Sequence, residues 1–255
     1  MTPGPARRAA MDELTVEQEG GVALITLCAP YRRNALTAAM AADLVTVCEE
    51  LDRNPDIGAV VIRGEGGHFC AGAHRDTLAI ASSDPAADGN YKTLESVYQA
   101  FARVGELAAP TISAVRGAAV GAGMNLALAT DLRIVATNAR LIAGFLRIGI
   151  HPGGGYFTLA TRLAGREAAA ATAIFGEEMD GARAARLGVA WSAVPDDQVE
   201  ARALELARRA AEDPELARVA VRSLRAEAGS SPLPWPLALE VERGVQMWSL
   251  RRRST

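Results

Sequence analysis

The chain has 255 residues, 49% of them hydrophobic, which is enough to bury the core of one α/β domain. Its formal net charge of −3 excludes a general attraction to nucleic acid or to an anionic membrane, and we expect neither partner. Three cysteines at unrelated spacings predict buried thiols and no metal site, and the lack of a membrane-length apolar segment predicts a cytoplasmic protein.

The N-terminal part of the sequence alternates short apolar runs with a helical pattern. Residues 1–10 show no periodicity and are predicted to be a disordered extension. Residues 16–19 and 22–27 predict a hairpin, because two glycines separate two strand-like runs. Thr37 is predicted to cap a helix that ends near residue 54, and residues 57–63 predict the next strand. This order implies a right-handed parallel crossover.

The rest of the chain continues the α/β pattern. Further strands are predicted at residues 111–115, 131–136 and 190–194, each separated by helical sequence. A segment rich in Ser, Asp, Gly and Pro within residues 77–90 predicts a mobile loop. After Pro195 the pattern is almost entirely helical, with stops at residues 213–214 and 230–236.

Two short segments of small residues follow apolar strands. Residues 69–73 read FCAGA and residues 117–125 read GAAVGAGMN. Glycine and alanine leave backbone N–H groups accessible to a ligand, and a helix N-terminus adds positive potential. Two such donors can form an oxyanion hole, which is the site of a negatively charged oxygen during acyl chemistry.

These motifs, with RNAL at residues 33–36 and IGIHPGGG at residues 148–155, occur in an order that resembles the crotonase family of enoyl-CoA hydratases and isomerases. The resemblance covers residues 15–248. It implies an α/β, crotonase-like ββα spiral over residues 11–194 and a helical C-terminal trimerisation region over residues 195–255. We expect this last region to be short of the family's usual final helix, and the assembly to be a homotrimer or hexamer.

The same resemblance implies an acyl-CoA thioester as ligand, with coenzyme A as part of the substrate and no separate cofactor. The N–H groups of Ala73 and Ala122 are the implied oxyanion donors. Five further residues are implied to contact substrate or coenzyme A, namely Arg33, Ala35, Ala71, Gly72 and Phe145. Arg32 and Arg75 are further candidates for contacts with its phosphates or adenine.

Proton transfer is where the sequence departs from the family. Hydratases of the family use two glutamates, and the matching positions here hold Asn125 and Phe145, neither of which transfers protons at neutral pH. Asn125 could still orient a water or a substrate carbonyl. His74 and His151 are the candidate replacement acid and base groups, because histidine titrates near neutral pH.

Three functions stay open at this point. The first is an enoyl-CoA hydratase or isomerase, acting through a thioester enolate with proton transfer reassigned. The second is a protein that binds acyl-CoA without turning it over. The third is another enolate reaction, such as isomerisation or decarboxylation.

Overall fold

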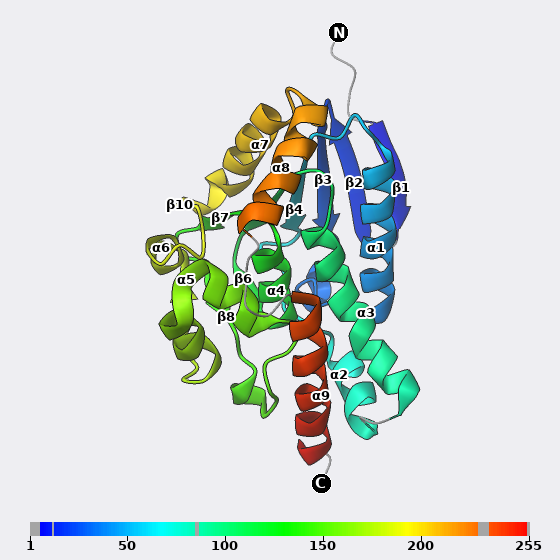
Figure 1. The fold of residues 1–255 in the computed structure, drawn as a ribbon, viewed down its shortest axis with the longest axis vertical. Coiled ribbons are helices and arrows are strands. Elements are labelled where there is room, and N and C mark those ends of the chain that lie inside the picture. Colours follow the sequence, from blue (N-terminus) through cyan, green and yellow to red (C-terminus); the bar gives the residue numbers. More distant parts are fainter. Residues whose placement is uncertain (1–5, 12, 85–86, 229–234, 254–255) are drawn as a thin grey trace.

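The computed structural model describes residues 6–11, 13–84, 87–228 and 235–253, and its centre is a seven-stranded sheet (Figure 1). The strand order is β1-β2-β3-β4-β5-β7-β10. The first three strands pair antiparallel and the others pair parallel. The bounds are β1 Ala6–Met11, β2 Leu14–Glu19, β3 Val22–Leu27, β4 Ala59–Gly64, β5 Thr111–Val115, β7 Leu132–Ala136 and β10 Ser192–Val194. This mixed architecture confirms the predicted fold class.

A smaller sheet lies beside the large one and has the order β6-β8-β9. Its strands are β6 Ala118–Val120, β8 Arg140–Ile142 and β9 Met179–Asp180. Strand β6 leads directly into helix α4 Ala122–Ala129, and β8 is followed by the loop at residues 143–145. The small sheet therefore brings two loops together at one place.

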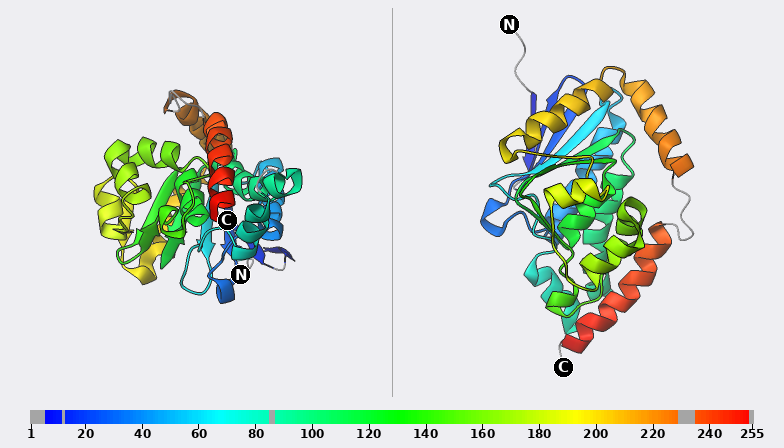
Figure 2. Two further views of the ribbon diagram at one scale, coloured as in Figure 1. Left: turned by 90° about the horizontal axis from the view of Figure 1, so that it is seen from below. Right: turned by 90° about the vertical axis from the view of Figure 1, so that its left-hand side faces the viewer.

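Helices cover both sheets. The remaining helices are α1 Ala38–Arg53, α2 Arg75–Ser83, α3 Asp88–Gly105, α5 Tyr156–Ala173, α6 Gly181–Arg186, α7 Val199–Ala210, α8 Pro214–Ala228 and α9 Trp235–Arg253. Helices α1 and α3 pack on each other, whereas α7 packs on β4, β5 and β7. Helices α7 and α8 lie toward the same end of the molecule as the N-terminal strands, and α9 lies at the other end, against α2 and α5 (Figure 2).

The predicted local signals account for helix α1. The Thr37 hydroxyl accepts a hydrogen bond from the N–H of Met40 at 3.1 Å, which caps the helix as predicted. The apolar positions at spacings of three and four face the core, where Leu44, Val47 and Leu51 are buried. The crossover from β3 through α1 to β4 is parallel, as the order of elements predicts.

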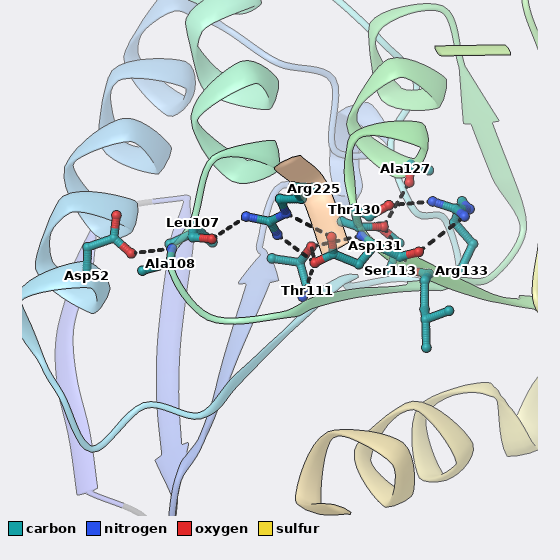
Figure 3. A network of polar contacts seen from close by, with 11 residues as sticks. Asp52, Leu107, Ala108, Thr111, Ser113, Ala127, Thr130, Asp131, Arg133 and Arg225 are labelled. Carbon is teal, nitrogen blue, oxygen red and sulfur yellow. Dashed lines mark hydrogen bonds and ion pairs between the residues drawn. The ribbon is translucent and has the colours of Figure 1, made fainter. Parts of the chain in front are cut away.

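A polar network fastens α8 to the sheet (Figure 3). The Arg225 guanidinium donates to both carboxylate oxygens of Asp131, at 3.0 and 2.6 Å, and to the carbonyl of Leu107. The same carboxylate accepts from the N–H and the hydroxyl of Thr111. Nearby, Arg133 donates to the carbonyls of residues 130, 131 and 189, and burial lowers the pKa of its guanidinium to about 10.

Two predictions about irregular segments are wrong. The disordered extension was predicted over residues 1–10, but residues 6–10 form most of strand β1, because pairing with β2 satisfies backbone groups whatever the side-chain pattern; residues 1–5 lie outside the described residues. The predicted mobile loop is mostly helical, since α2 continues to Ser83 and α3 begins at Asp88. Residues 85–86, like most of the predicted stop at 230–236, lie outside the described residues.

The described residues contain neither a membrane-spanning helix nor a metal-binding cluster. No helix in them combines the length and apolarity needed to cross a lipid bilayer. They also bring together no group of three or more His, Cys, Asp or Glu side chains that could hold a metal ion.

Candidate functional site

A cavity of about 520 Å³ lies where three loop segments meet helices α2, α3 and α9. Residues 71–73, 120–122 and 143–145 form one side of it. Apolar side chains of α2 and α3 form much of the other side, together with Tyr98 of α3 and Gln246 of α9. Both segments that the sequence singled out therefore reach the same cavity.

Backbone hydrogen bonds hold the first of these segments against the small sheet. The N–H of Cys70 donates to the carbonyl of Ala118 at 3.1 Å, and the N–H of Val120 donates to the carbonyl of Cys70 at 3.0 Å. On its other side, the N–H of Leu36 donates to the carbonyl of Gly72 at 2.7 Å. The segment is thus fixed between the loop at residues 33–36 and strand β6.

Two glycines permit the close approach of the two segments. A Cβ on Gly72 would lie 2.6 Å from the carbonyl oxygen of Val120 and 3.4 Å from the nitrogen of Ala122, and its φ of +93° is itself unfavourable for other residues. A Cβ on Gly123 would lie 2.2 Å from the carbonyl oxygen of Cys70. Any side chain at either position would push the segments apart.

The N–H groups of Ala73 and Ala122 both belong to residues that line the cavity. Ala122 is the first residue of α4, so its N–H has no acceptor within the helix. Among the described residues, neither N–H has a hydrogen-bond acceptor in any other element. The cavity wall therefore contains two neighbouring backbone donors, one of them at the positive end of a helix.

The loop at residues 33–36 is shaped by Asn34, a role that the sequence reasoning missed. Arg33 and Asn34 both have positive φ, of 53° and 56°. The buried Asn34 amide accepts from the N–H of Ala29 at 2.9 Å and donates to the carbonyls of Glu65 and His68. The signal was available, because asparagine tolerates the left-handed region better than most residues.

The arginine and alanine predicted for coenzyme A binding lie apart from the large cavity. Arg33 lines a second cavity of about 240 Å³, which adjoins the first because Ala71 and Val120 line both. Ala35 is buried, and its carbonyl accepts from Arg32 at 2.9 Å. Arg32 is paired with Glu13, whereas the exposed Arg75 lines the large cavity.

Asn125 lies on α4, one turn after Ala122, and also lines the cavity. Its side chain is 1% exposed, and its amide nitrogen donates to the carbonyls of Gly153 and Gly154 at 2.8 and 3.3 Å. These two acceptors fix the orientation of the amide, because a reversed group would place oxygen against oxygen. The Oδ1 atom then has no hydrogen-bond partner among the described residues.

Phe145 forms an apolar part of the wall, as predicted. Its ring packs edge-on against Tyr156, with 5.5 Å between the ring centroids. The Tyr156 hydroxyl lies 2.7 Å from the hydroxyl of Thr172, and burial raises the pKa of the phenol to about 12. This pair supports the wall from behind and presents no titrating group to the cavity.

The two histidines proposed as acid and base groups are not among the residues that line the cavity. His74 caps α2, where its Nδ1 accepts from the N–H of Asp76 at 3.3 Å. His151 lies beside the ring of Phe157, and its Nδ1 is 2.6 Å from the carbonyl oxygen of Pro152. Within the described part of the chain, no carboxylate and no imidazole line the cavity.

Tyr98 and Gln246 are the polar groups that the sequence reasoning missed. The Tyr98 hydroxyl donates to the Gln246 amide oxygen, and the Gln246 amide nitrogen donates to the carbonyl of His151 at 3.1 Å. Gly153 lies against both, since a Cβ there would be 2.3 Å from either side chain. Nothing in the sequence signals this pair, because its members are 148 residues apart.

Comparison with known proteins adds to this geometry. A family model described as enoyl-CoA hydratase/isomerase matches residues 17–248. A probable enoyl-CoA hydratase of Mycobacterium tuberculosis is 40% identical over 247 residues, which cover 95% of this chain and 94% of the relative. A 1,2-epoxyphenylacetyl-CoA isomerase of Escherichia coli is 30% identical over 230 residues, which cover 90% of this chain and 88% of the relative.

Solved structures give the same result. An enoyl-CoA hydratase from Mycobacterium avium subsp. paratuberculosis superposes with a TM-score of 0.82 at 25% identity, covering 96% of each chain. Another enoyl-CoA hydratase, from Polaromonas, superposes with a TM-score of 0.79 at 30% identity and covers 91% of this chain and 90% of that one. The similarity therefore includes both the sheet and the helices that surround the cavity.

Proposed function

Because the chain belongs to the enoyl-CoA hydratase/isomerase family, we propose that its cavity binds the acyl part of an acyl-CoA thioester and polarises the thioester carbonyl. The N–H groups of Ala73 and Ala122 are the oxyanion donors in this proposal. The observation that carries it is that these two N–H groups have no acceptors in the described structure and belong to residues that line one cavity. In this proposal the coenzyme A part extends from the thioester into the adjoining cavity at Arg33.

The chemistry follows from the two donors. When a thioester oxygen accepts two hydrogen bonds, it can carry negative charge, and the neighbouring carbon then behaves as an enolate. Loss of one such donor typically costs on the order of 10²–10³ in rate. The fixed geometry around Gly72 and Gly123 keeps the donors in place before the ligand arrives, so no reorganisation is needed.

The first test removes one donor. Ala73→Pro deletes the N–H, keeps the carbonyl and the Cβ, and adds two ring carbons, and turnover of any accepted thioester should fall by about 10² or more. S-Butyl coenzyme A, a thioether without a carbonyl oxygen, is the matched control ligand. Its affinity should stay within about twofold, which separates donor loss from misfolding. Unchanged turnover would refute the proposed role of Ala73.

The residues available for proton transfer limit which reactions the cavity can catalyse. With Asn125 and Phe145 at the two positions where the family's hydratases carry glutamates, we expect hydration of crotonyl-CoA to be very slow, by roughly 10⁴–10⁸ if the two losses multiply. Decarboxylation reaches the same enolate by loss of CO2 and needs no base, whereas isomerisation still needs one group that takes up a proton and returns it. Among the relatives, an isomerase is 30% identical and a probable hydratase 40% identical, so the similarity does not decide between these reactions. The Asn125→Glu, Phe145→Glu double variant should gain hydratase activity.

A second candidate function is acyl-CoA binding without turnover. It is favoured by one observation, the lack of carboxylates and imidazoles in the described lining of the cavity. Binding of butyryl-CoA together with no turnover of any enoyl-CoA offered would establish it. If instead the rate of turnover changes with pH near 6.5, and this change is lost in His74→Gln or His151→Gln, the replaced histidine takes part in proton transfer.

The remaining family properties are also proposals for this chain. We expect a homotrimer or hexamer, with coenzyme A present only as part of the substrate. Light scattering at micromolar protein concentration would test the assembly, and a monodisperse monomer would contradict it.

A further inference from the structure

Arg75 is the one charged residue among the described residues that line the large cavity. It is exposed, and its guanidinium has no hydrogen-bond or ion-pair partner within the described part of the chain. The next residue, Asp76, lies beside the imidazole of His74 instead, with 3.6 Å between its Oδ2 and the Nδ1 of the ring. The cavity therefore carries a positive charge that no described acidic group neutralises.

The geometry of helix α2 directs the side chain of Arg75 toward the cavity. The residues of this helix that line the cavity are Arg75, Leu78, Ala79 and Ser82. Because successive residues of a helix turn by about 100°, these four positions fall on one face, and Arg75 lies inside it and not at its edge. The buried Thr77 belongs to the opposite side, which packs on the core.

The charge lies near the place proposed for the thioester. Arg75 comes two residues after Ala73, so the Cα atoms of the two residues are at most about 7 Å apart. The side chains of a helix lean toward its N-terminus, which is the end of α2 where Ala73 lies. The guanidinium is therefore expected beside the first carbons of an acyl chain whose carbonyl oxygen meets the Ala73 N–H.

We infer that Arg75 binds a carboxylate on the acyl chain, so that the cavity selects thioesters of short dicarboxylic acids over those of monocarboxylic acids. This inference rests on the proposed function, because the acyl chain passes Arg75 only if the thioester lies at Ala73. A guanidinium can donate two parallel hydrogen bonds to a carboxylate and matches its charge. A hydroxyl or a keto group on the acyl chain would leave the charge of Arg75 without a counterion.

The other helices that border the cavity offer no competing carboxylate among their described side chains. Asp88 of α3 pairs with Lys92. Glu95 of α3 and Glu240 of α9 both pair with Arg243. Helices α2 and α4 begin at the cavity, so their N-terminal ends add positive potential to that of Arg75. A ligand carboxylate thus meets favourable charge and no repulsion from the described lining.

The exposed position of Arg75 limits where the carboxylate can lie. Deeper in the cavity the wall is apolar and buried, with Leu94, Val97 and Phe145 among its residues. A carboxylate placed against these side chains would lose its hydration without gaining a partner, whereas one at Arg75 keeps part of its hydration. This difference favours a chain of few carbons, and it makes the contact sensitive to salt.

The test compares acyl groups of equal length that differ in charge. Isothermal titration would measure the affinities of succinyl-CoA and glutaryl-CoA, of their neutral monoamides, and of butyryl-CoA and valeryl-CoA. Coenzyme A is the same in every ligand, so its contribution cancels in each ratio. We expect at least one carboxyacyl thioester to bind about tenfold more tightly than both its amide and its alkyl counterpart, and this preference to decrease as the salt concentration rises.

Three variants locate the contact. Arg75→Gln removes the charge and should bring the preference to about onefold, whereas Arg75→Lys should keep part of it, because lysine retains the charge without the planar pair of donors. Arg33→Gln is the matched control, since it removes an arginine from the adjoining cavity and should leave the preference unchanged. Circular dichroism would verify that the three variants are folded.

The outcomes separate this inference from the proposed function. If carboxyacyl and alkyl thioesters bind equally to the unmodified protein, or if the preference survives Arg75→Gln, the carboxylate contact is refuted while acyl-CoA binding stands. If Arg75→Gln weakens all the thioesters by one common factor, Arg75 contacts coenzyme A instead, which also refutes the inference. A preference lost in Arg33→Gln but kept in Arg75→Gln would assign the carboxylate to the adjoining cavity. If no thioester binds, the proposed function itself fails.

Discussion

Replacing Gly123 by alanine is predicted to damage the site through a single added methyl group. The new Cβ would lie 2.2 Å from the backbone oxygen of Cys70, whereas ordinary contacts begin near 3.4 Å. The two segments must then separate by about 1.2 Å, and neither can yield easily, because one is a helix and the other is hydrogen-bonded to β6. The N–H of Ala122 moves with the helix.

The expected magnitude combines opposing effects. Alanine favours a helix over glycine by roughly 0.5–1 kcal/mol, but an added methyl group in a close-packed site costs roughly 1–3 kcal/mol. We therefore expect Gly123→Ala to lower the free energy of unfolding by about 1–2 kcal/mol. Turnover of an accepted thioester should fall by about 10², since a displacement near 1 Å misaligns the donor with the carbonyl oxygen.

The matched control is Gly244→Ala. Gly244 also lies within a helix, α9, and a Cβ there would meet nothing within 4 Å. This variant should keep its activity and gain stability by about 0.5–1 kcal/mol. Urea unfolding and steady-state rates would be measured for both proteins side by side. If Gly123→Ala is as stable and as active as Gly244→Ala, the close approach of the two segments is not what positions the donors.

Three further predictions concern stability and reactivity. Arg32 lowers the pKa of Glu13 from 4.5 to about 2, so Glu13→Gln should lower the free energy of unfolding by at most about 3 kcal/mol above pH 4.5. In urea titrations this loss should shrink as the pH falls from 4.5 toward 2. The exposed Glu49→Gln should change the free energy of unfolding little, and equal losses in the two variants would refute the pairing of Glu13 with Arg32. Arg225→Met should cost about 1–3 kcal/mol of unfolding free energy, because it removes two hydrogen bonds from α8 to Asp131 and one to the carbonyl of Leu107. Arg222→Met on the same helix should cost far less. Iodoacetamide at pH 8 should modify Cys28 first, because burial raises the pKa of the Cys48 and Cys70 thiols to about 12. Mass spectrometry would show the order of labelling, and equal labelling of all three thiols would contradict the buried positions of Cys48 and Cys70.

Sequence patterns are sufficient for the elements that carry a clear apolar signal. Apolar residues at spacings of three and four predict helix α1 nearly to its bounds, and short continuous apolar runs predict strands β3, β4 and β5, which are almost wholly buried. Strand β1 was missed for the opposite reason. It lies at the edge of the sheet, where backbone pairing to β2 decides its conformation and the side chains carry no pattern.

The candidate site, like the fold, was predictable from the sequence only in part. The segments around Gly72 and Gly123 were predictable, because the need for glycine at a close approach is visible in the sequence. The positions of His74 and His151 were not, because proximity along the chain does not set the direction of a side chain. His74 follows Ala73 directly and yet caps α2 instead of lining the cavity. Its proposed role in proton transfer remains a prediction that the cavity lining does not support.

Asn125 shows how the hydrogen bonds of a neutral side chain limit what the site can do. The sequence left open whether its amide orients a water or a substrate carbonyl. The structure removes the second option, because the amide nitrogen, its only donor, is already bound to the glycine loop at Gly153 and Gly154. The remaining Oδ1 atom is a buried acceptor that cannot take up a proton near neutral pH. Asn125 therefore cannot act as a base, and any proton lost from an enolising substrate must go to another group.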